Sequence, residues 1–308
     1  MTLYIDPPLW PAHGTVFSHL ISDASLEELH RFAAAAGISE RAFDQDHYDV
    51  PELRWSALVE RGAVPVSGGE LARILARSGL RVRARERSAK VRPHLSRSWA
   101  RLGHRLLGEE GPAAQRWAEL GDDLLDRWSE PHRSYHALPH LASVLRTLRL
   151  LERHGECAPA RDPALPLAGW YHDAVYAGTA GEDEEASARL AQEHLDGLLP
   201  AAVVEEAARL VRLTSSHAPE GDDVSGSALV DADLEVLGRE PALYRRYAGQ
   251  VRADYAHVPE PRFRAGRAQV LEGLLSAPQL YRTRTGQRLW EEQARRNLRQ
   301  ELQELSGR

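Results

Sequence analysis

From about residue 95 to the C-terminus, apolar side chains recur at helical spacing, and no convincing strand pattern interrupts them. The clearest run lies between Leu141 and Leu151, where leucines and a valine follow the i, i+3, i+4, i+7 order of a buried helix stripe. Further helices are predicted at residues 184–198, 203–217, 230–237, 242–256, 260–275 and 284–305. Proline or glycine marks most of the breaks between them. This part of the chain is therefore predicted to fold as an all-α bundle.

Residues 1–80 show a different pattern, in which short apolar segments alternate with turn signals. Strands are predicted at residues 3–5 and 63–66, and helices at 25–36, 51–61 and 69–77. Ser25 and Glu28 have the spacing of a capping box, and a glycine follows the end of each predicted helix. We expect a small α+β domain here, joined by a basic linker at residues 81–94 to a second domain at residues 95–308.

The basic stretch between Arg81 and Arg105 contains nine arginines and lysines against a single acidic residue, Glu86. For roughly residues 80–92 of this stretch, a solvated connector is the simplest interpretation, because charge runs are usually exposed. Weak contact with nucleic acid or with a nucleotide tail is the alternative. The net charge of the whole chain is −6, so nucleic acid is not expected as a general partner.

Several classes of protein are excluded or disfavoured by composition. The only lysine, Lys90, lies in ERSAKVRP and cannot serve a P-loop, and the chain contains no GxGxxG or GxSxG motif. Cys157 is the only cysteine, which excludes an intramolecular disulfide and suits a reducing compartment. The first residues do not resemble a signal peptide, and no apolar run approaches the roughly 18 residues of a membrane span. We expect a cytoplasmic protein without a membrane partner.

Histidine and aspartate residues of the helical part occur in the order His140, His172-Asp173, Asp233, each on a predicted helix. Imidazole nitrogens and carboxylate oxygens bind divalent cations such as Mn²⁺, Mg²⁺, Co²⁺, Ni²⁺, Fe²⁺ or Zn²⁺. Three helices that face one bundle axis can bring such side chains together. An octahedral ion with four protein ligands retains positions for a water, whose pKa it lowers, and for a phosphate oxygen. The pattern predicts a divalent metal cofactor of open identity.

Four segments carry a resemblance to a known family: EPHRSYHALPHL, WYHDAVYAG, DEEASA and DADLEVLG, in this order. They resemble a bacterial branch of the HD superfamily of metal-dependent phosphohydrolases. The similarity extends through Arg252–Tyr255, Phe263–Arg267 and the final RRNL, and it covers about residues 95–308. The chain departs from the branch at Ala137 and Asp183, where asparagine is usual; the first departure changes a hydrogen-bonding group beside the ligands.

The resemblance implies an HD-type helical bundle whose metal ligands are His140, His172, Asp173 and Asp233. In DADLEVLG, the second aspartate matches the last ligand of the superfamily. Asp231 and Asp233 lie about 200° apart around a helix, so one ion is not expected to bind both. We therefore favour Asp233, with Asp231 as the alternative.

Three residues are candidates for catalysis. Asp173 is expected to orient the attacking water in addition to binding metal. His217 ends a predicted helix, where a protonated imidazole is stabilised for structural reasons alone; the functional alternatives are a substrate-phosphate contact, a general acid or a ligand of a second metal. Glu184 lies in the first turn of a predicted helix, a position that favours an acidic residue with or without a catalytic role.

Four residues are candidates for binding the substrate: His136, Arg252, Tyr255 and Arg267. The arginines can hold a phosphate through bidentate hydrogen bonds, and surface solvation is the alternative for them. His132 is interpreted as a structural hydrogen-bonding residue.

The segments IDPPLWPAHG, FSHLISD and FDQDHYDV of residues 1–80 resemble a small bacterial and phage domain of unknown function. These segments are dense in histidine and aspartate, and they also contain His13 and Asp44. A candidate pocket for a second metal or for phosphate comprises Asp6, His19, Asp46, His47 and Asp49. Alternatively, these side chains cap turns around two short strands.

The sequence therefore predicts a metal-dependent phosphohydrolase that cleaves a phosphate ester or anhydride of a small substrate, in particular a nucleotide. One alternative is a non-catalytic sensor, in which the helical domain binds a metal or nucleotide and the N-terminal domain recruits a partner. Another places chemistry in both halves, as sequential steps on one substrate.

Overall fold

The computed structural model describes residues 2–12, 14–44, 46–81, 88–108, 110–159, 161–179 and 181–307. The chain divides into two units, which we describe separately. The N-terminal unit comprises Met1–Arg87 with Pro241–Arg246, and the helical unit comprises Ser88–Glu240 with Tyr247–Arg308. His13 and residues 82–87 of the predicted linker lie outside the described residues. The remainder of that predicted linker, from Ser88 onward, belongs to a helix rather than to an irregular connector.

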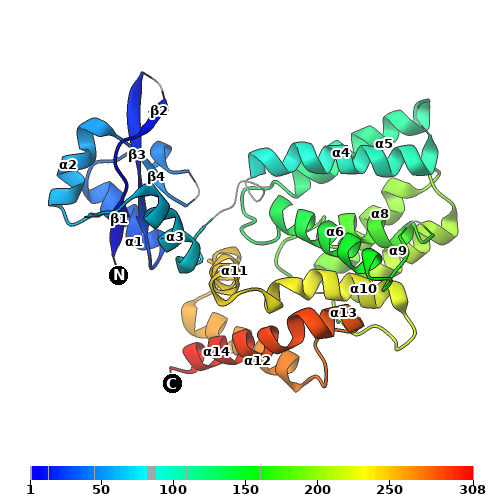
Figure 1. The fold of residues 1–308 in the computed structure, drawn as a ribbon. Helices are drawn as coiled ribbons and strands as arrows, with labels where there is room; N and C mark the ends of the chain where they lie inside the picture. Colours follow the sequence, from blue (N-terminus) through cyan, green and yellow to red (C-terminus); the bar gives the residue numbers. More distant parts are fainter. Residues whose placement is uncertain are drawn as a thin grey trace. The chain divides into compact units, whose positions relative to one another are not determined.

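The N-terminal unit contains a five-stranded mixed sheet (Figure 1). Its strands are β1 (Leu3–Ile5), β2 (Trp10–Ala12), β3 (Thr15–Ser22), β4 (Tyr48–Pro51) and β5 (Val64–Pro65). The long strand β3 pairs antiparallel with β1, β2 and β4, and β5 pairs parallel with β1. The sheet is therefore organised around β3.

Helices cover both faces of this sheet. They are α1 (Leu26–Ala35), the short 3₁₀ helix η1 (Glu40–Ala42), α2 (Glu52–Glu60) and α3 (Gly68–Ser78). Leu20 of β3 packs with residues of α1 and α2, whereas Ile21 packs with Leu71 and Leu75 of α3. Successive side chains of a strand point to opposite faces, so β3 has an α1/α2 face and an α3 face.

The predictions for this unit were partly confirmed. Both predicted strands and all three predicted helices are present, and Ser25 caps α1 by accepting from the backbone N–H of Glu28. The capping box does not close as predicted, because the Glu28 carboxylate accepts from the Ser22 hydroxyl instead. The prediction of only two strands was wrong, since β2, β3 and β4 were not anticipated.

The helical unit consists mostly of helices, as predicted. They are α4 (Ser88–Leu107), α5 (Pro112–Arg127), α6 (Leu138–Arg153), α7 (Ala164–Tyr171), α8 (Glu182–Leu195), α9 (Ala201–Leu213), α10 (Val224–Asp233), η3 (Leu234–Gly238), the part of α11 (Pro241–Asp254) from Tyr247 onward, α12 (Glu260–Ser276), α13 (Arg284–Gly286), the π-helical segment η4 (Gln287–Glu291) and α14 (Glu292–Ser306). Within the described parts of the chain, each helix is too short or too polar to cross a membrane.

Helix α6 runs through the middle of this unit (Figure 1). It contacts α4, α7 and α10, and the apolar stripe predicted between Leu141 and Leu151 is buried throughout. Helix α7 is almost entirely buried. Gly169 lets α7 approach closely, because a Cβ at this position would lie 3.2 Å from the Leu148 side chain of α6. The close packing of α6, α7 and α10 positions the residues of the candidate site.

Candidate metal centre

Helices α6, α7 and α10 bring the predicted histidines and one of the two aspartates of DAD to one point. His140 lies in the first turn of α6, and His172 is the residue that follows α7. Asp233 is the last residue of α10. One ligand atom from each of these three residues lies within 4.8 Å of the other two. The order of residues along the sequence therefore becomes a cluster in space.

The spacing of the ligand atoms suits one metal ion. His140 Nε2 lies 3.1 Å from both His172 Nε2 and Asp233 Oδ1, and His172 Nε2 lies 3.8 Å from Asp233 Oδ1. Asp173 Oδ2 lies 3.3 Å from His172 Nε2 and 3.7 Å from His140 Nε2. Atoms that bind one ion at about 2.1 Å are separated by about 3.0 to 3.4 Å for neighbouring octahedral or tetrahedral positions. Three of the five distances lie in this range, and a small contraction of the 3.7 and 3.8 Å distances would close the two nitrogens and two carboxylate oxygens around a divalent cation.

The His172 imidazole is held in the orientation that a metal ligand needs. The Nδ1–H of His172 donates to the carbonyl oxygen of Gly169 at 2.9 Å, which leaves the lone pair of Nε2 facing the cluster. Aromatic rings line the apolar side: the Trp128 ring centroid lies 5.2 Å from that of His172, and the Tyr135 centroid lies 4.6 Å from that of His140. Burial lowers the pKa of His140, which favours the neutral, ligand-competent imidazole.

Asp233 divides its two oxygens between the cluster and His217. Its Oδ1 faces His140, and its Oδ2 lies 2.8 Å from His217 Nε2. Burial alone would raise the pKa of Asp233, but hydrogen bonds from His140 and His217 outweigh burial and hold it well below the usual range. His217 lies beyond the end of α9, with a φ of 50°, and not on the helix end where it was predicted.

Asp231, the alternative last ligand, faces elsewhere. It is fully buried and accepts from the backbone N–H groups of Arg282 and Thr283 at 2.7 and 2.8 Å, and from the Thr283 hydroxyl at 2.6 Å. These bonds tie α10 to the segment before α13. The two aspartates of DAD therefore have different surroundings, and only Asp233 lies beside the histidines.

Arg133, which the sequence did not single out, connects the loops that carry the site. Its side chain is fully buried. Its guanidinium donates to the carbonyl oxygens of Asp173 at 2.6 Å, Ala174 at 3.0 Å and His136 at 3.2 Å. The residue sits inside the EPHRSYH segment, but its role depends on carbonyl groups 40 residues away, which no sequence pattern reveals.

Two aspartates outside the predicted ligand set also shape the site. Asp254 accepts from the backbone N–H groups of Ser134 and Tyr135 and lies 2.9 Å from His136 Nδ1. Asp183 accepts from three successive backbone N–H groups in the loop that follows Asp173, at residues 177–179. Carboxylates that accept several backbone bonds fix loop conformations, so both are positioning residues.

The predicted substrate-binding residues differ in where they lie. His136 stacks on Tyr176 with centroids 4.3 Å apart, and its own centroid lies 5.9 Å from that of His140. Arg267 is buried and forms a bidentate ion pair with Glu301. The guanidinium of Arg252 bonds to Glu260 and to two carbonyl oxygens near the end of α11. Both arginines thus already have protein partners.

Three further predicted residues occupy local positions. Glu184 caps α8 by accepting from the Gly181 N–H, while its charge also helps to raise the pKa of His217. The Tyr255 ring packs near Phe263 with centroids 6.2 Å apart. His132 is exposed and lies 2.9 Å from the Tyr176 carbonyl oxygen, a hydrogen bond of the structural kind that was predicted.

The candidate residues of the N-terminal unit also form a cluster. Ligand atoms of His19, His47 and Asp49 lie within 4.8 Å of one another. Asp6 and Asp46 lie behind the two imidazoles, 3.0 Å from His19 Nδ1 and 2.5 Å from His47 Nδ1 respectively. Burial alone would lower the pKa of His47, but Asp46 and Asp49 raise it to about 9.

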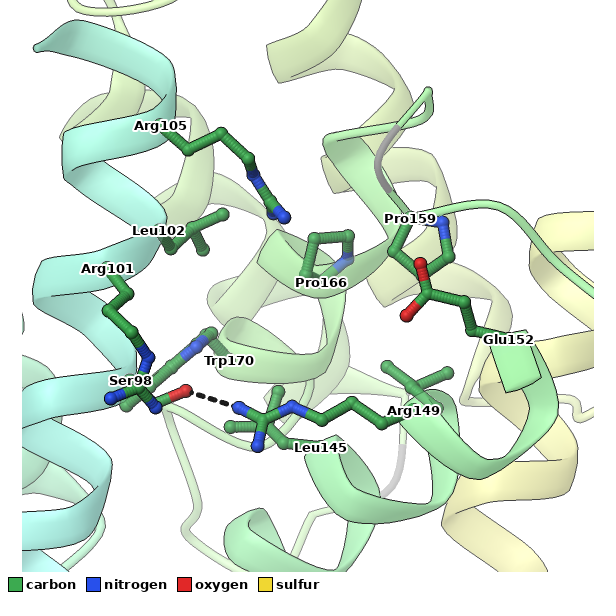
Figure 2. A pocket seen from close by; sticks show the side chains of 11 residues that line it. Ser98, Arg101, Leu102, Arg105, Leu145, Arg149, Glu152, Pro159, Pro166 and Trp170 are labelled. Carbon is green, nitrogen blue, oxygen red and sulfur yellow. Dashed lines mark hydrogen bonds between the residues drawn. The ribbon is translucent and has the colours of Figure 1, made fainter.

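A separate pocket of about 290 Å³ is lined by residues of α4, α6 and α7 and by Pro159 (Figure 2). Arg101 and Arg105 of α4 and Arg149 of α6 line it, together with Glu152 and the Trp170 ring. Burial and the like charge of Arg101 lower the pKa of Arg149, whose guanidinium donates to the Ser98 hydroxyl at 2.8 Å. The arginines near residue 100, which follow the predicted connector in the sequence, therefore line a concave surface whose chemistry suits a small anion.

Comparison with known proteins identifies the first part of the chain. Residues 3–78 match the model of a family described as a protein of unknown function, DUF4031. These residues are a DUF4031 domain. The predicted resemblance of residues 1–80 to a small domain of unknown function is confirmed at this level. No curated protein and no solved structure gave a significant match to the chain.

Proposed function

We propose that residues 95–308 form an HD-type metal-dependent phosphohydrolase that acts on a phosphate ester or anhydride of a small substrate such as a nucleotide. The observation that carries the proposal is the convergence of His140, His172 and Asp233 from three helices, with Asp173 beside them. The same four positions follow from the motif order that resembles the HD superfamily. Spatial clustering and motif order are different kinds of support, and they agree.

The roles of the protein side chains follow from their surroundings. His140, His172, Asp173 and Asp233 would hold the ion; when bound, a divalent cation polarises a phosphate oxygen and lowers the pKa of a coordinated water. Arg133 fixes the backbone of Asp173 through the carbonyl oxygens of residues 173 and 174. This contact orients the carboxylate that we assign to the attacking water.

Two histidines border the proposed reaction site. His136 is about one-fifth exposed, and Asp254 beside its Nδ1 helps to raise its pKa against the effect of burial. His217 is 30% exposed and hydrogen-bonded to Asp233. Each can face a bound phosphate as a proton donor or as a cationic contact. We assign substrate contact to His136 and general acid or second-ion binding to His217.

The proposal is tested with purified full-length protein that has been stripped of metal and reloaded with Mn²⁺, Mg²⁺, Co²⁺, Ni²⁺, Fe²⁺ or Zn²⁺. Phosphate release is measured from nucleoside mono-, di- and triphosphates. We expect release with at least one metal, and a loss of at least about 100-fold in Asp173→Asn and His140→Gln. His132→Gln is the matched control, because the His132 side chain is about half exposed and bonds to the Tyr176 carbonyl oxygen rather than to any of the proposed ligands.

The same measurement separates the proposal from a non-catalytic sensor. A sensor would bind metal and nucleotide, but it would release no phosphate with any ion of the panel. Phosphate release that persists unchanged in both Asp173→Asn and His140→Gln would place the chemistry outside this cluster. Either result would contradict the proposal.

A further inference from the structure

Strand pairing in the DUF4031 domain places three potential ligands on one face of the sheet. In the β3–β4 pair, His19 lies directly opposite Asp49. His47 is the residue before β4, and its Nε2 lies 3.5 Å from Asp49 Oδ1, so it joins the other two on this side of the sheet. Their neighbours Leu20, Tyr48 and Val50 pack into the core on the other side. The cluster therefore lies on the α3 face.

Asp6 reaches the same face from the end of β1. Its backbone N–H donates to the His19 carbonyl oxygen, and a Cβ at Gly68, the first residue of α3, would lie 3.5 Å from its carboxylate. One Asp6 oxygen accepts from the His19 N–H, and the other accepts from the Trp10 indole. Asp6 is thus fixed from several directions.

Each imidazole is oriented by a buried carboxylate. The Asp6 and Asp46 side chains are 3% and 0% exposed, and they contact the Nδ1 atoms of His19 and His47 respectively. Their burial is costly unless they have strong partners. Donation by Nδ1 leaves Nε2 of each ring as the metal-binding atom, the arrangement found behind many histidine ligands.

The two Nε2 atoms face the same oxygen. Asp49 Oδ1 lies 3.5 Å from His47 Nε2 and 3.8 Å from His19 Nε2. Ligands about 2.1 Å from a tetrahedral ion lie about 3.4 Å apart, so a small contraction closes this set around a cation. Asp49 and Trp10 are about half exposed, so the open side of the cluster is accessible from solvent.

We propose that the DUF4031 domain binds a divalent transition-metal ion through His19 Nε2, His47 Nε2 and an Asp49 carboxylate oxygen. Asp6 and Asp46 orient the imidazoles and are positioning residues. Two imidazole ligands select a cation such as Zn²⁺, Co²⁺, Ni²⁺ or Fe²⁺ over Mg²⁺ and Ca²⁺, which prefer oxygen. Three protein ligands leave a position for water or an exchangeable ligand, as in reactive rather than purely structural centres. The inference does not depend on the function of the helical unit.

The test counts metal in the full-length protein after loading with Co²⁺ and removal of free ions. His47→Gln and Asp49→Asn should each bind about one ion per chain less than the wild type and lose part of the visible Co²⁺ absorption. All of these proteins keep the helical unit unchanged, so the difference reports the DUF4031 domain alone. His30→Gln is the matched control: His30 belongs to the same domain but contacts Tyr48 outside the cluster, and its replacement should leave the count unchanged.

Asp6→Asn adds a readout that loss of a ligand does not give. It leaves the three ligands in place and removes the charge behind His19, so Co²⁺ affinity should fall about 10- to 100-fold while the stoichiometry at saturation is retained. Circular dichroism verifies that each variant is folded. If His47→Gln is unfolded, the test relies on Asp49→Asn, because the half-exposed Asp49 side chain can be replaced with less disturbance of the fold. Equal metal content in wild type and folded Asp49→Asn, with unchanged affinity in Asp6→Asn, would overturn the proposal.

Discussion

Replacement of Asp231 by alanine should destabilise the protein, and the structure sets the size of the effect. The change leaves the backbone N–H groups of Arg282 and Thr283 and the Thr283 hydroxyl without their acceptor. At about 2 kcal/mol for each unsatisfied donor, the gross loss is about 6 kcal/mol. The carboxylate itself resists burial, which raises its pKa to about 6. A shift of about two pKa units corresponds to an unfavourable free energy of about 3 kcal/mol for the ionised carboxylate in the folded protein at neutral pH. Asp231→Ala removes this unfavourable contribution, because the variant has no carboxylate to bury. The expected net loss is about 3 kcal/mol.

Urea denaturation at pH 7, followed by tryptophan fluorescence, measures this loss in metal-free protein. Asp231→Asn keeps the shape and one acceptor oxygen, so it should lose less than Asp231→Ala. Thr283→Val removes one of the three donors together with its need for an acceptor, and the double variant with Asp231→Ala should be less than additive. An Asp231→Ala protein within about 0.5 kcal/mol of wild type would refute the reasoning, since surface substitutions have effects of that size.

Three further predictions concern other parts of the helical unit. Asp223 caps α10 and pairs with Arg209, and the pKa of its carboxyl is lowered. At pH values above the unfolded-state pKa near 4, Asp223→Asn should therefore lower the free energy of unfolding by about 1 kcal/mol. In acid unfolding curves, this difference from wild type should vanish as the pH falls through the folded-state pKa. Burial raises the pKa of Cys157 to about 12, so Ellman's reagent at pH 8 should react at least about 100-fold more slowly with native than with urea-unfolded protein; equal rates would contradict this burial. Ala137 occupies the N-cap of α6 without a side-chain hydrogen bond. Ala137→Asn should therefore raise the free energy of unfolding by about 1 kcal/mol in urea melts. A lower free energy of unfolding would exclude a capping role for Asn at this position.

Helical elements were predictable from the sequence where their apolar periodicity is uninterrupted. The stripe of α6 is the clearest case, and all of its predicted apolar members are buried. Helix α10 was predicted to begin at residue 230 but begins at Val224, with Asp223 as its cap. Gly226 and the neighbouring serines weaken the helical pattern there, although close packing requires the glycine: a Cβ would lie 2.6 Å from the Leu213 side chain.

Strands β3 and β4 were not predictable from alternation, because polar residues interrupt them. His19 lies in β3 and Asp49 in β4, and both belong to the cluster of the DUF4031 domain. A strand that carries polar side chains on an inner face loses the pattern by which strands are recognised. The failure of the pattern at these positions is therefore informative in itself, since such failures are expected at functional sites.

In the helical unit, the order of motifs predicted which residues lie together but not how their surroundings are used. His140, His172 and Asp233 were named from sequence and are adjacent in space. The partners of Arg252 and Arg267 lie 8 and 34 residues away along the chain, so their ion pairs could not be inferred. Phosphate binding by these arginines would require breaking existing contacts, which makes them weaker candidates than His136.

Metal binding by two matched variants tests the central claim most directly. The parent is Asp49→Asn, which lacks a ligand of the proposed centre in the DUF4031 domain. The parent and its Asp233→Ala and Asp231→Asn derivatives are stripped of metal and loaded with Mn²⁺, and bound metal is counted by mass spectrometry. The account predicts about one ion per chain for the parent and for Asp231→Asn, and little or none for Asp233→Ala. Retention of the ion by Asp233→Ala would contradict the assignment of the metal centre, and its simultaneous loss from Asp231→Asn would move the last ligand to Asp231.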